Sequence, residues 1–199
     1  LAGTKQPDEL DVMTFNIQDA VISGADDYLP SGRREAVAQV LADERPDVVG
    51  TQELLVWQAE ALREDLARAG LRYARYGRAR VSDDEASGAD FNETVSVLWN
   101  PDVLTDLDRG DVWICAEGTE PVQGCIDSGP GWRAGDPRML TWVRFRHRAT
   151  GTELVVVNTH LDATSAQARE HGAQVVRDTA QTLFPGTPVV VTADFNGGP

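Results

Sequence analysis

Two uninterrupted apolar runs in the last third of this 199-residue chain constrain its fold most strongly. They read ELVVVNTHL (153–161) and PVVVTADF (188–195), and both are short and rich in β-branched valine, which favours strands over helices. An apolar run without alternation is typical of a strand that is buried on both faces. We therefore predict that both segments lie in the interior of a covered sheet.

The rest of the chain adds further strands and helices. Four more segments have strand-like composition: LDVMTFNI (10–17), DVVGTQE (47–53), TVSVLWN (94–100) and MLTWVRFR (139–146). Three segments have the helical spacing of apolar residues: 31–46, 56–70 and 164–185, the last with a capping-box pattern at Thr164 and Gln167. The mixture predicts an α/β fold, either a doubly wound sheet or a layered α/β sandwich, in one domain over 1–199.

The charge of the chain narrows the classes of partner. There are 18 basic and 32 acidic residues, which gives a net charge of −14. Proteins that bind the phosphate backbone of nucleic acids normally carry the opposite, positive charge. Nucleic acid is therefore a disfavoured partner. Phosphorylated substrates are compatible with this charge, because a bound divalent cation supplies its own positive field and needs acidic ligands. The sequence has no apolar stretch long enough to cross a membrane.

Cys115 and Cys125 are ten residues apart in a loop-like stretch. Without CxxC spacing or a nearby histidine, they do not resemble a redox or metal pair. We expect a short structural disulfide, with two thiols of a cytosolic protein as the alternative. A disulfide implies an oxidising compartment, and together with the acidic surface it predicts a secreted, extracellular protein.

Polar side chains follow four of the apolar segments where each one ends. They are Asn16, Glu53, Asn158 with His160, and Asp194 with Asn196. Each has a structural explanation when taken alone, such as a turn, a helix cap or a hydrogen-bonded buried histidine. Ligands of α/β proteins bind beyond the carboxyl ends of strands, so we expect the four ends to form one pocket.

The residue types at these ends indicate a metal-assisted chemistry. Carboxylate and amide oxygens with a separate histidine suit Mg²⁺, with Mn²⁺ as the second choice, better than zinc, which would need more imidazole or thiolate. A hard cation held by one or two carboxylates is the usual setting for phosphoryl chemistry. The residues alone therefore predict a metal-dependent phosphoester hydrolase.

An ordered set of motifs resembles the endonuclease/exonuclease/phosphatase superfamily. The motifs are MTFNI, PDVVGTQE, FNETVSVLW, DPRMLTWV, VVVNTHLD and VVVTADFN, and the resemblance covers residues 10 to 196. The resemblance implies a four-layered α/β sandwich with two packed mixed sheets, and a Mg²⁺-dependent attack of water on a phosphoester. DVWICAEGTEP, GWRAGDPRMLTW and NTHLDATSAQAR are most similar to a bacterial, often exported branch.

The resemblance also implies roles for single residues. Glu53 matches the principal metal ligand, and Asn16 its neighbour at the same cation. His160 matches the histidine that contacts the phosphate and stabilises charge in the transition state. Asp194 matches the carboxylate that orients or deprotonates the attacking water, and Asn196 the amide that holds a phosphate oxygen.

Three further positions follow from the same motifs. Glu93 falls where the family often has a glutamate that supports the catalytic histidine pair. Asn158 and Arg138 are expected on the substrate side of the site, with a packing role as the alternative for Arg138.

One departure from the family pattern concerns the end of the chain. Members of the family have later strands that carry another aspartate and a Ser-Asp-His segment, and the only histidines here are His147, His160 and His171. We therefore expect a domain whose C-terminal strands are missing, with a complementing C-terminal fragment or chain as a partner.

We rank the functions that the resemblance implies. Phosphatase or phosphodiesterase action on a small or polyol-type phosphoester stands above secreted endonuclease or deoxyribonuclease action. A catalytically inactive binding module, or one half of a split protein, is the alternative from another class.

Overall fold

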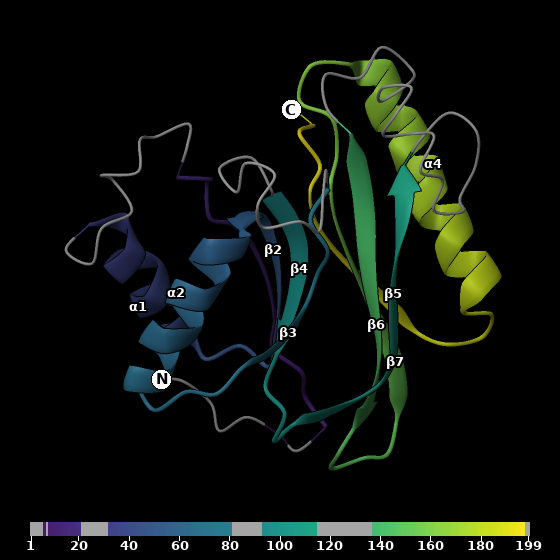
Figure 1. The fold of residues 1–199 in the computed structure, drawn as a ribbon. Helices are drawn as coiled ribbons and strands as arrows, with labels where there is room; N and C mark the ends of the chain where they lie inside the picture. The colour runs from purple at the N-terminus through teal and green to yellow at the C-terminus, as the bar shows by residue number, and fades with distance from the viewer. Residues whose placement is uncertain (1–5, 7, 21–31, 81–92, 115–136, 198–199) are drawn as a thin grey trace.

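Two four-stranded mixed sheets form the centre of the computed structural model, which describes residues 6, 8–20, 32–80, 93–114 and 137–197 (Figure 1). The first sheet has the order β1-β2-β4-β3: Val12–Asn16, Val48–Leu55, Glu93–Trp99 and Ala74–Tyr76. The second has the order β5-β6-β7-β8: Leu104–Ile114, Arg138–His147, Glu153–His160 and Val189–Asp194. β1 is parallel to β2 and β7 is parallel to β8, whereas the other neighbours are antiparallel.

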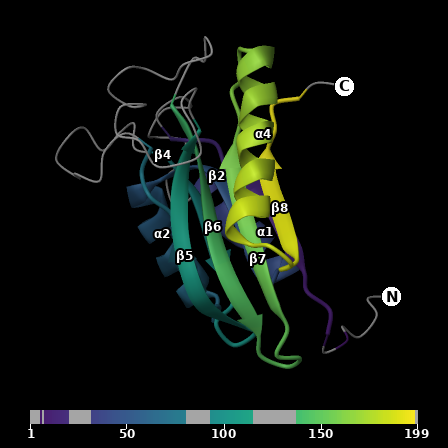
Figure 2. The same cartoon turned by 90° about the vertical axis from the view of Figure 1, so that its right-hand side faces the viewer.

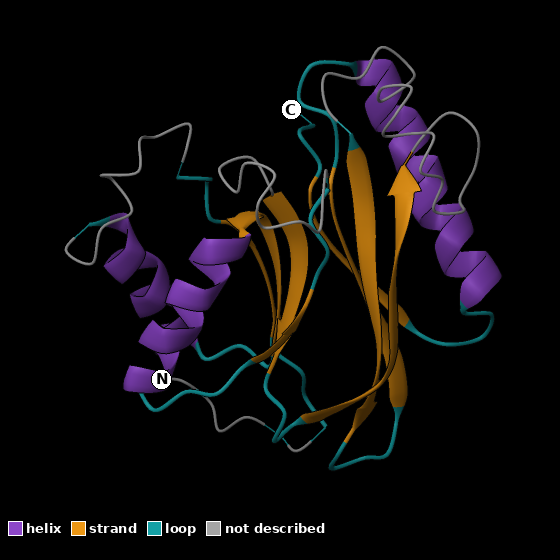
Figure 3. Ribbon diagram, in the orientation of Figure 1, coloured by secondary structure: helices purple, strands orange, loops and turns teal. Residues whose placement is uncertain are grey.

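Helices cover the outer face of each sheet. α1 (Arg33–Glu44) and α2 (Val56–Arg68) lie against the first sheet, and α4 (Ala166–Leu183) lies against the second (Figures 1 and 3). The view from the side shows α4 running along β7 and β8 (Figure 2). The described elements are therefore stacked as helices, sheet, sheet and helix. None of these helices is both long and apolar enough to cross a membrane.

The apolar side chains form three clusters, one in each space between layers. Along β7, Val155 and Val157 pack with α4, while Val156 packs between the two sheets. In β2, Val48 faces the second sheet and Val49 faces the helices. Neighbouring residues thus enter different clusters, which explains why these runs need no polar alternation. The prediction that 153–161 is buried on both faces is confirmed.

Among the described residues, the matching prediction for 188–195 does not hold. β8 pairs with β7 alone among the described strands, so it forms an edge of its sheet, and Val191 is 40% exposed. Strand composition identified the strand correctly, but the degree of burial depends on a neighbour that the local sequence does not specify.

Two strands have no clear signal in the sequence. β5 carries four charged residues between Asp106 and Asp111 and was not predicted, and β3 is only three residues long. The N-cap of α4 is Ser165, whose side chain accepts a hydrogen bond from the Ala168 N–H, and not Thr164 as the capping-box pattern predicted. Cys115 and Cys125 lie outside the described residues, so the disulfide stays a prediction.

The two sheets approach closely near the end of β1 and β8. The Thr14 hydroxyl donates a hydrogen bond to the Ala193 carbonyl at 3.2 Å across the gap. At Gly50 of β2 an added Cβ would lie 1.9 Å from Thr192 Oγ1 and 2.6 Å from Asn158 Oδ1, so the strand has no room for a side chain there. This contact brings the carboxyl ends of β1, β2, β7 and β8 to the same place.

Candidate active site

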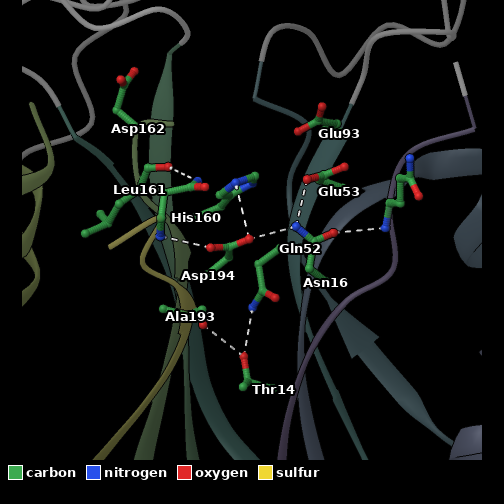
Figure 4. A network of polar contacts seen from close by, with 12 residues as sticks. Thr14, Asn16, Gln52, Glu53, Glu93, His160, Leu161, Asp162, Ala193 and Asp194 are labelled. Carbon is green, nitrogen blue, oxygen red and sulfur yellow. Dashed lines mark hydrogen bonds and ion pairs between the residues drawn. The ribbon is translucent and has the colours of Figure 1, made fainter. Parts of the chain in front are cut away.

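Four strand ends place their polar side chains around one point between the sheets (Figure 4). Asn16 ends β1 and Glu53 lies near the end of β2, both in the first sheet. His160 ends β7 and Asp194 ends β8, in the second sheet. The convergence that the sequence predicted is therefore present, and each sheet contributes two of the four residues.

The side-chain amide of Asn16 joins the two sheets. Its Nδ2 donates to Glu53 Oε1 at 2.7 Å and to Asp194 Oδ2 at 2.9 Å, while its Oδ1 accepts from the Gln18 N–H at 2.9 Å. One amide thus separates two carboxylates that would otherwise repel each other.

Glu53 is held in an unusual backbone conformation. The β2–β4 register shifts between Thr51 and Leu54, and Glu53 within that bulge has a φ of 58°. Its Oε2 accepts a hydrogen bond from the Asp19 N–H at 3.1 Å. Bulges redirect side chains near active sites, and a non-glycine residue in the left-handed region is a strain that the surrounding contacts must maintain.

Asp194 is held as a carboxylate. Its Oδ1 accepts from the Asn196 N–H at 2.9 Å, and Asn196 in turn donates from Nδ2 to the Leu161 carbonyl at 2.9 Å. Burial alone would raise the pKa of Asp194, but hydrogen bonds from Asn16 and the Asn196 backbone, with His160 and Arg138 nearby, lower it below its usual range. Asp194 is therefore ionised at neutral pH.

His160 is neutral in this setting. Burial, with Arg138 and Arg80 nearby, lowers the pKa of His160 to about 4, although Asp194 and Glu53 act in the opposite direction. Its Nε2 lies 3.9 Å from Asp194 Oδ2. The Nδ1 atom is buried and has no hydrogen-bond partner among the described residues. The ring can thus offer a lone pair to a cation or one N–H to an anion.

A hollow next to His160 contains two arginines and Glu93. Arg80 Nη2 lies 3.1 Å from Glu93 Oε1, and the hollow also includes Arg138, which is 8% exposed. Burial, with Glu53 and Asp19 nearby, raises the pKa of Glu93 to about 7 in spite of Arg80 and Arg138. The sequence motifs pointed to Glu93 and Arg138. Arg80 was missed, because nothing distinguishes it from the other arginines of its segment.

Asn158 lies between the sheets, away from solvent. Its Nδ2 donates to the carbonyls of Thr51 and Ser96 at 2.8 and 3.0 Å. Its Oδ1 accepts from Gln52 Nε2 at 2.7 Å and from Thr192 Oγ1 at 3.1 Å. The amide is fully buried and makes four hydrogen bonds, which supports a role in fixing the two sheets. Its contact with substrate stays a prediction.

The donor set fits a hard divalent cation. Glu53, His160 and Asp194 each offer a ligand atom, and these atoms all lie within 4.8 Å of one another. The two carboxylates suit a hard divalent cation, and the neutral imidazole can face either a metal ion or an anion. Asn16 turns its Nδ2 toward the carboxylates, so a ligand role for Asn16 requires the amide to turn and present its oxygen.

Comparison with known proteins identifies the family. The model of the Endonuclease/Exonuclease/phosphatase family matches residues 13–199, so this chain belongs to that family. A comparison with curated proteins gave no match.

Several solved protein structures have a fold similar to that of this chain. A mannosyl-6-phosphatase of Bacteroides thetaiotaomicron is 28% identical, with a TM-score of 0.76 over 94% of this chain and 66% of its own. An endonuclease/exonuclease/phosphatase of Bacteroides vulgatus is also 28% identical, with a TM-score of 0.78 and the same two coverages. The human Nocturnin catalytic domain, at 14% identity and a TM-score of 0.73, covers 96% of this chain and 65% of its own, and shows the fold alone. This chain thus spans about two thirds of the length of these proteins.

Proposed function

We propose that this protein is a divalent-cation-dependent phosphoester hydrolase that acts on a small, polyol-type phosphate monoester. The observation that carries the proposal is the pair of carboxylates, Glu53 and Asp194, joined through Asn16 and placed beside a neutral His160. Partly buried carboxylates of opposite sheets repel each other unless a positive group lies between them.

Glu53 would hold the cation, and ligand atoms of Asp194 and His160 lie within 4.8 Å of its carboxylate. When bound, Mg²⁺ supplies a Lewis acid for the phosphoryl oxygens and lowers the pKa of a bound water. The amide oxygen of Asn16 is the further ligand expected from the sequence. The bulge at Glu53 aims its carboxylate into this point and away from the pleated face of β2.

Asp194 is suited to orient the attacking water. A carboxylate whose pKa is lowered by two hydrogen bonds is a weak base, so it accepts a hydrogen bond from water better than it removes a proton. The hydrogen bonds from Asn16 and Asn196 also hold its two oxygens in fixed directions. Orientation of this kind contributes to the rate because it reduces the entropy lost on reaching the transition state.

His160, Arg80 and Arg138 are suited to bind the phosphate. A neutral imidazole can donate one hydrogen bond to a phosphoryl oxygen, and the two guanidinium groups line the adjoining hollow. We assign Asn196 to a phosphate oxygen as well, once its Nδ2 leaves the Leu161 carbonyl.

The choice of a small phosphomonoester has two supports. The net charge of −14 disfavours a polyanionic nucleic acid, whereas a small substrate meets only the local field of the two arginines and the cation. A similar protein with 28% identity is described as a mannosyl-6-phosphatase. Secreted endonuclease activity is the second candidate from the family, and a site without activity is the third.

We also propose that further strands complete the domain. β1 and β8 lie at the ends of the two described sheets and expose apolar side chains at Val12, Val191 and Phe195. Similar proteins are about half as long again as this chain. Strands of a complementing polypeptide at these edges would cover the apolar side chains and add residues to the site. Secretion and the Cys115–Cys125 disulfide remain part of the proposal on the sequence evidence alone.

Hydrolysis assays with a Glu53→Gln variant test the function. We expect release of phosphate from a hexose 6-phosphate that depends on Mg²⁺, stops with a chelator, and falls by about 100-fold or more in Glu53→Gln, because removal of a metal ligand has at least this effect. Glu60→Gln is the matched control, since Glu60 is an exposed residue of α2.

Other results of these assays would contradict the mechanism or favour one of the alternative functions. Equal activity of Glu53→Gln and the parent protein would contradict the mechanism. Nicking of plasmid DNA without hydrolysis of the monoester would favour the endonuclease. A folded protein that hydrolyses neither substrate would favour a binding module or half of a split protein.

A further inference from the structure

The side chain of Arg33 holds a short loop that follows β1. Its Nη1 donates to the Ile17 carbonyl and, at 2.6 Å, to the Gln18 carbonyl, and its Nη2 lies 3.5 Å from the Asp19 carbonyl. One guanidinium therefore reaches three successive carbonyl groups. A guanidinium can do this because it holds several N–H donors in a fixed planar arrangement.

The same peptide units face the candidate active site on their other side. The Gln18 N–H donates to Asn16 Oδ1 at 2.9 Å, and the Asp19 N–H donates to Glu53 Oε2 at 3.1 Å. Two peptide units thus lie between the Arg33 cation and the site, each with its carbonyl toward Arg33 and its N–H toward a site residue.

This arrangement couples the cation to the site through the backbone. Hydrogen bonds polarise one another along a chain, so a carbonyl that accepts from a charged guanidinium makes the N–H of its peptide unit a better donor. The Asp19 N–H then holds Glu53 Oε2 more firmly, and the Gln18 N–H holds the amide of Asn16.

The backbone of the loop needs such support. Gln18 has a φ of 59° and Glu53, which the loop contacts, has a φ of 58°. Non-glycine residues in this region are strained and persist only where several contacts fix them. Arg33 provides contacts on the loop side of this pair.

The helix that carries Arg33 gives no reason for an arginine there. Arg33 is the first residue of α1, where the aligned peptide dipoles favour acidic side chains and disfavour a cation. The hydrogen bonds to the loop carbonyls offset this unfavourable interaction of Arg33 with the helix dipole.

We propose that Arg33 is a positioning residue of the cation site, which directs Glu53 through the peptide unit that joins Gln18 and Asp19. The inference rests on the proposed cation dependence of this site. It assigns Arg33 no contact with substrate or with the cation.

Calorimetric titration of the chain with MgCl₂ or MnCl₂ tests the inference without an activity assay. We expect Arg33→Met to weaken cation binding by about 10- to 100-fold, as loss of a group that orients a metal ligand does. Arg33→Lys keeps the charge and one donor, so it should recover part of the affinity. A purely electrostatic role predicts the opposite sign, because removal of a nearby positive charge would tighten binding of a cation.

Arg34→Met is the matched control. Arg34 is the next residue of the same helix and has comparable burial, but its guanidinium binds Asp65 of α2 at 2.7 and 2.8 Å. We expect this variant to lower the free energy of unfolding in urea and to leave the cation affinity unchanged. Weakening of equal size in Arg33→Met and Arg34→Met would show a loss of general stability and would overturn the inference.

The failure of the inference and that of the proposed function can be told apart. If the parent protein binds the cation and Glu53→Gln does not, but Arg33→Met binds as well as or better than the parent protein, then the inference alone is wrong. If the parent protein binds neither Mg²⁺ nor Mn²⁺, both are wrong.

Discussion

At the scale of the residue, Asn16 reduces the repulsion between the carboxylates of Glu53 and Asp194. Its Nδ2 donates to Glu53 and Asp194, which come from different sheets, while Gln18 holds its oxygen. The positive edge of the Asn16 amide dipole thus lies between the two carboxylates. The proposed cation would act on the same pair of charges.

We predict that Asn16→Asp destabilises the protein in a cation-dependent way. In a chelator the third carboxylate should lower the free energy of unfolding by about 2 kcal/mol, because two donated hydrogen bonds become repulsions in a partly buried site. Added MgCl₂ should remove most of this deficit, since three carboxylates bind a divalent cation more tightly than two. Urea unfolding with and without MgCl₂ measures both effects.

Asn100→Asp provides the control for this prediction. The Asn100 side chain accepts a hydrogen bond from the Asp102 N–H at 2.9 Å, a role that aspartate also fulfils. We expect no dependence of its stability on MgCl₂. A deficit of Asn16→Asp that is the same in MgCl₂ and in chelator would contradict a cation at this position.

At the scale of the element, β2 combines the close approach of the sheets with the aim of Glu53. Gly50 lets the second sheet approach, and three residues later the bulge turns Glu53 toward Asp194. Between them, Gln52 donates to Asn158 across the gap. One strand thus sets both the distance between the sheets and the direction of the Glu53 side chain.

We predict that Gly50→Ala is strongly destabilising. The new Cβ would lie 1.9 Å from Thr192 Oγ1 and 2.6 Å from Asn158 Oδ1, so the sheets must separate or the buried hydrogen bonds of Asn158 must break. We expect a loss of about 2 to 3 kcal/mol in the free energy of unfolding, the cost of overpacking a close contact. Gly197→Ala, at a position with no atom within 4 Å of the added Cβ, should change it by less than about 0.5 kcal/mol.

Strands and their ends could be predicted from the sequence because local chemistry determines them. The apolar runs at β1, β2, β7 and β8 and the polar residues that end them are visible in single segments. Their convergence follows from the rule that strands of an α/β sheet present ligands at their carboxyl ends.

Burial and long-range contacts could not be predicted in the same way. β7 and β8 have nearly the same apolar composition, yet β7 is interior and β8 is an edge, because burial depends on neighbours in space. Arg33 was not predicted as part of the site either. Its contacts are with backbone carbonyls fourteen to sixteen residues away, and such contacts leave no side-chain pattern in the sequence.

At the scale of the whole molecule, the exposed edges of the two sheets lie side by side. β1 and β8 are the last described strands of their sheets, and the Thr14–Ala193 hydrogen bond joins them. Edge strands offer unpaired N–H and C=O groups to other chains, and exposed apolar side chains add to this tendency. Val191 lies on β8 with 40% of its surface exposed.

We therefore predict that this chain self-associates through the β8 edge, and that Val191→Lys weakens the association. Loss of one buried valine removes about 1.5 kcal/mol from the contact, and a charge on an edge strand opposes pairing. The association constant should fall by about tenfold, as 1.4 kcal/mol corresponds to that factor. Sedimentation equilibrium over a range of concentrations measures this association constant.

Val40→Lys is the control, because Val40 is also 40% exposed but lies on α1. If the two variants weaken the association equally, the added surface charge accounts for the effect at both positions. That outcome would contradict a contact at the β8 edge.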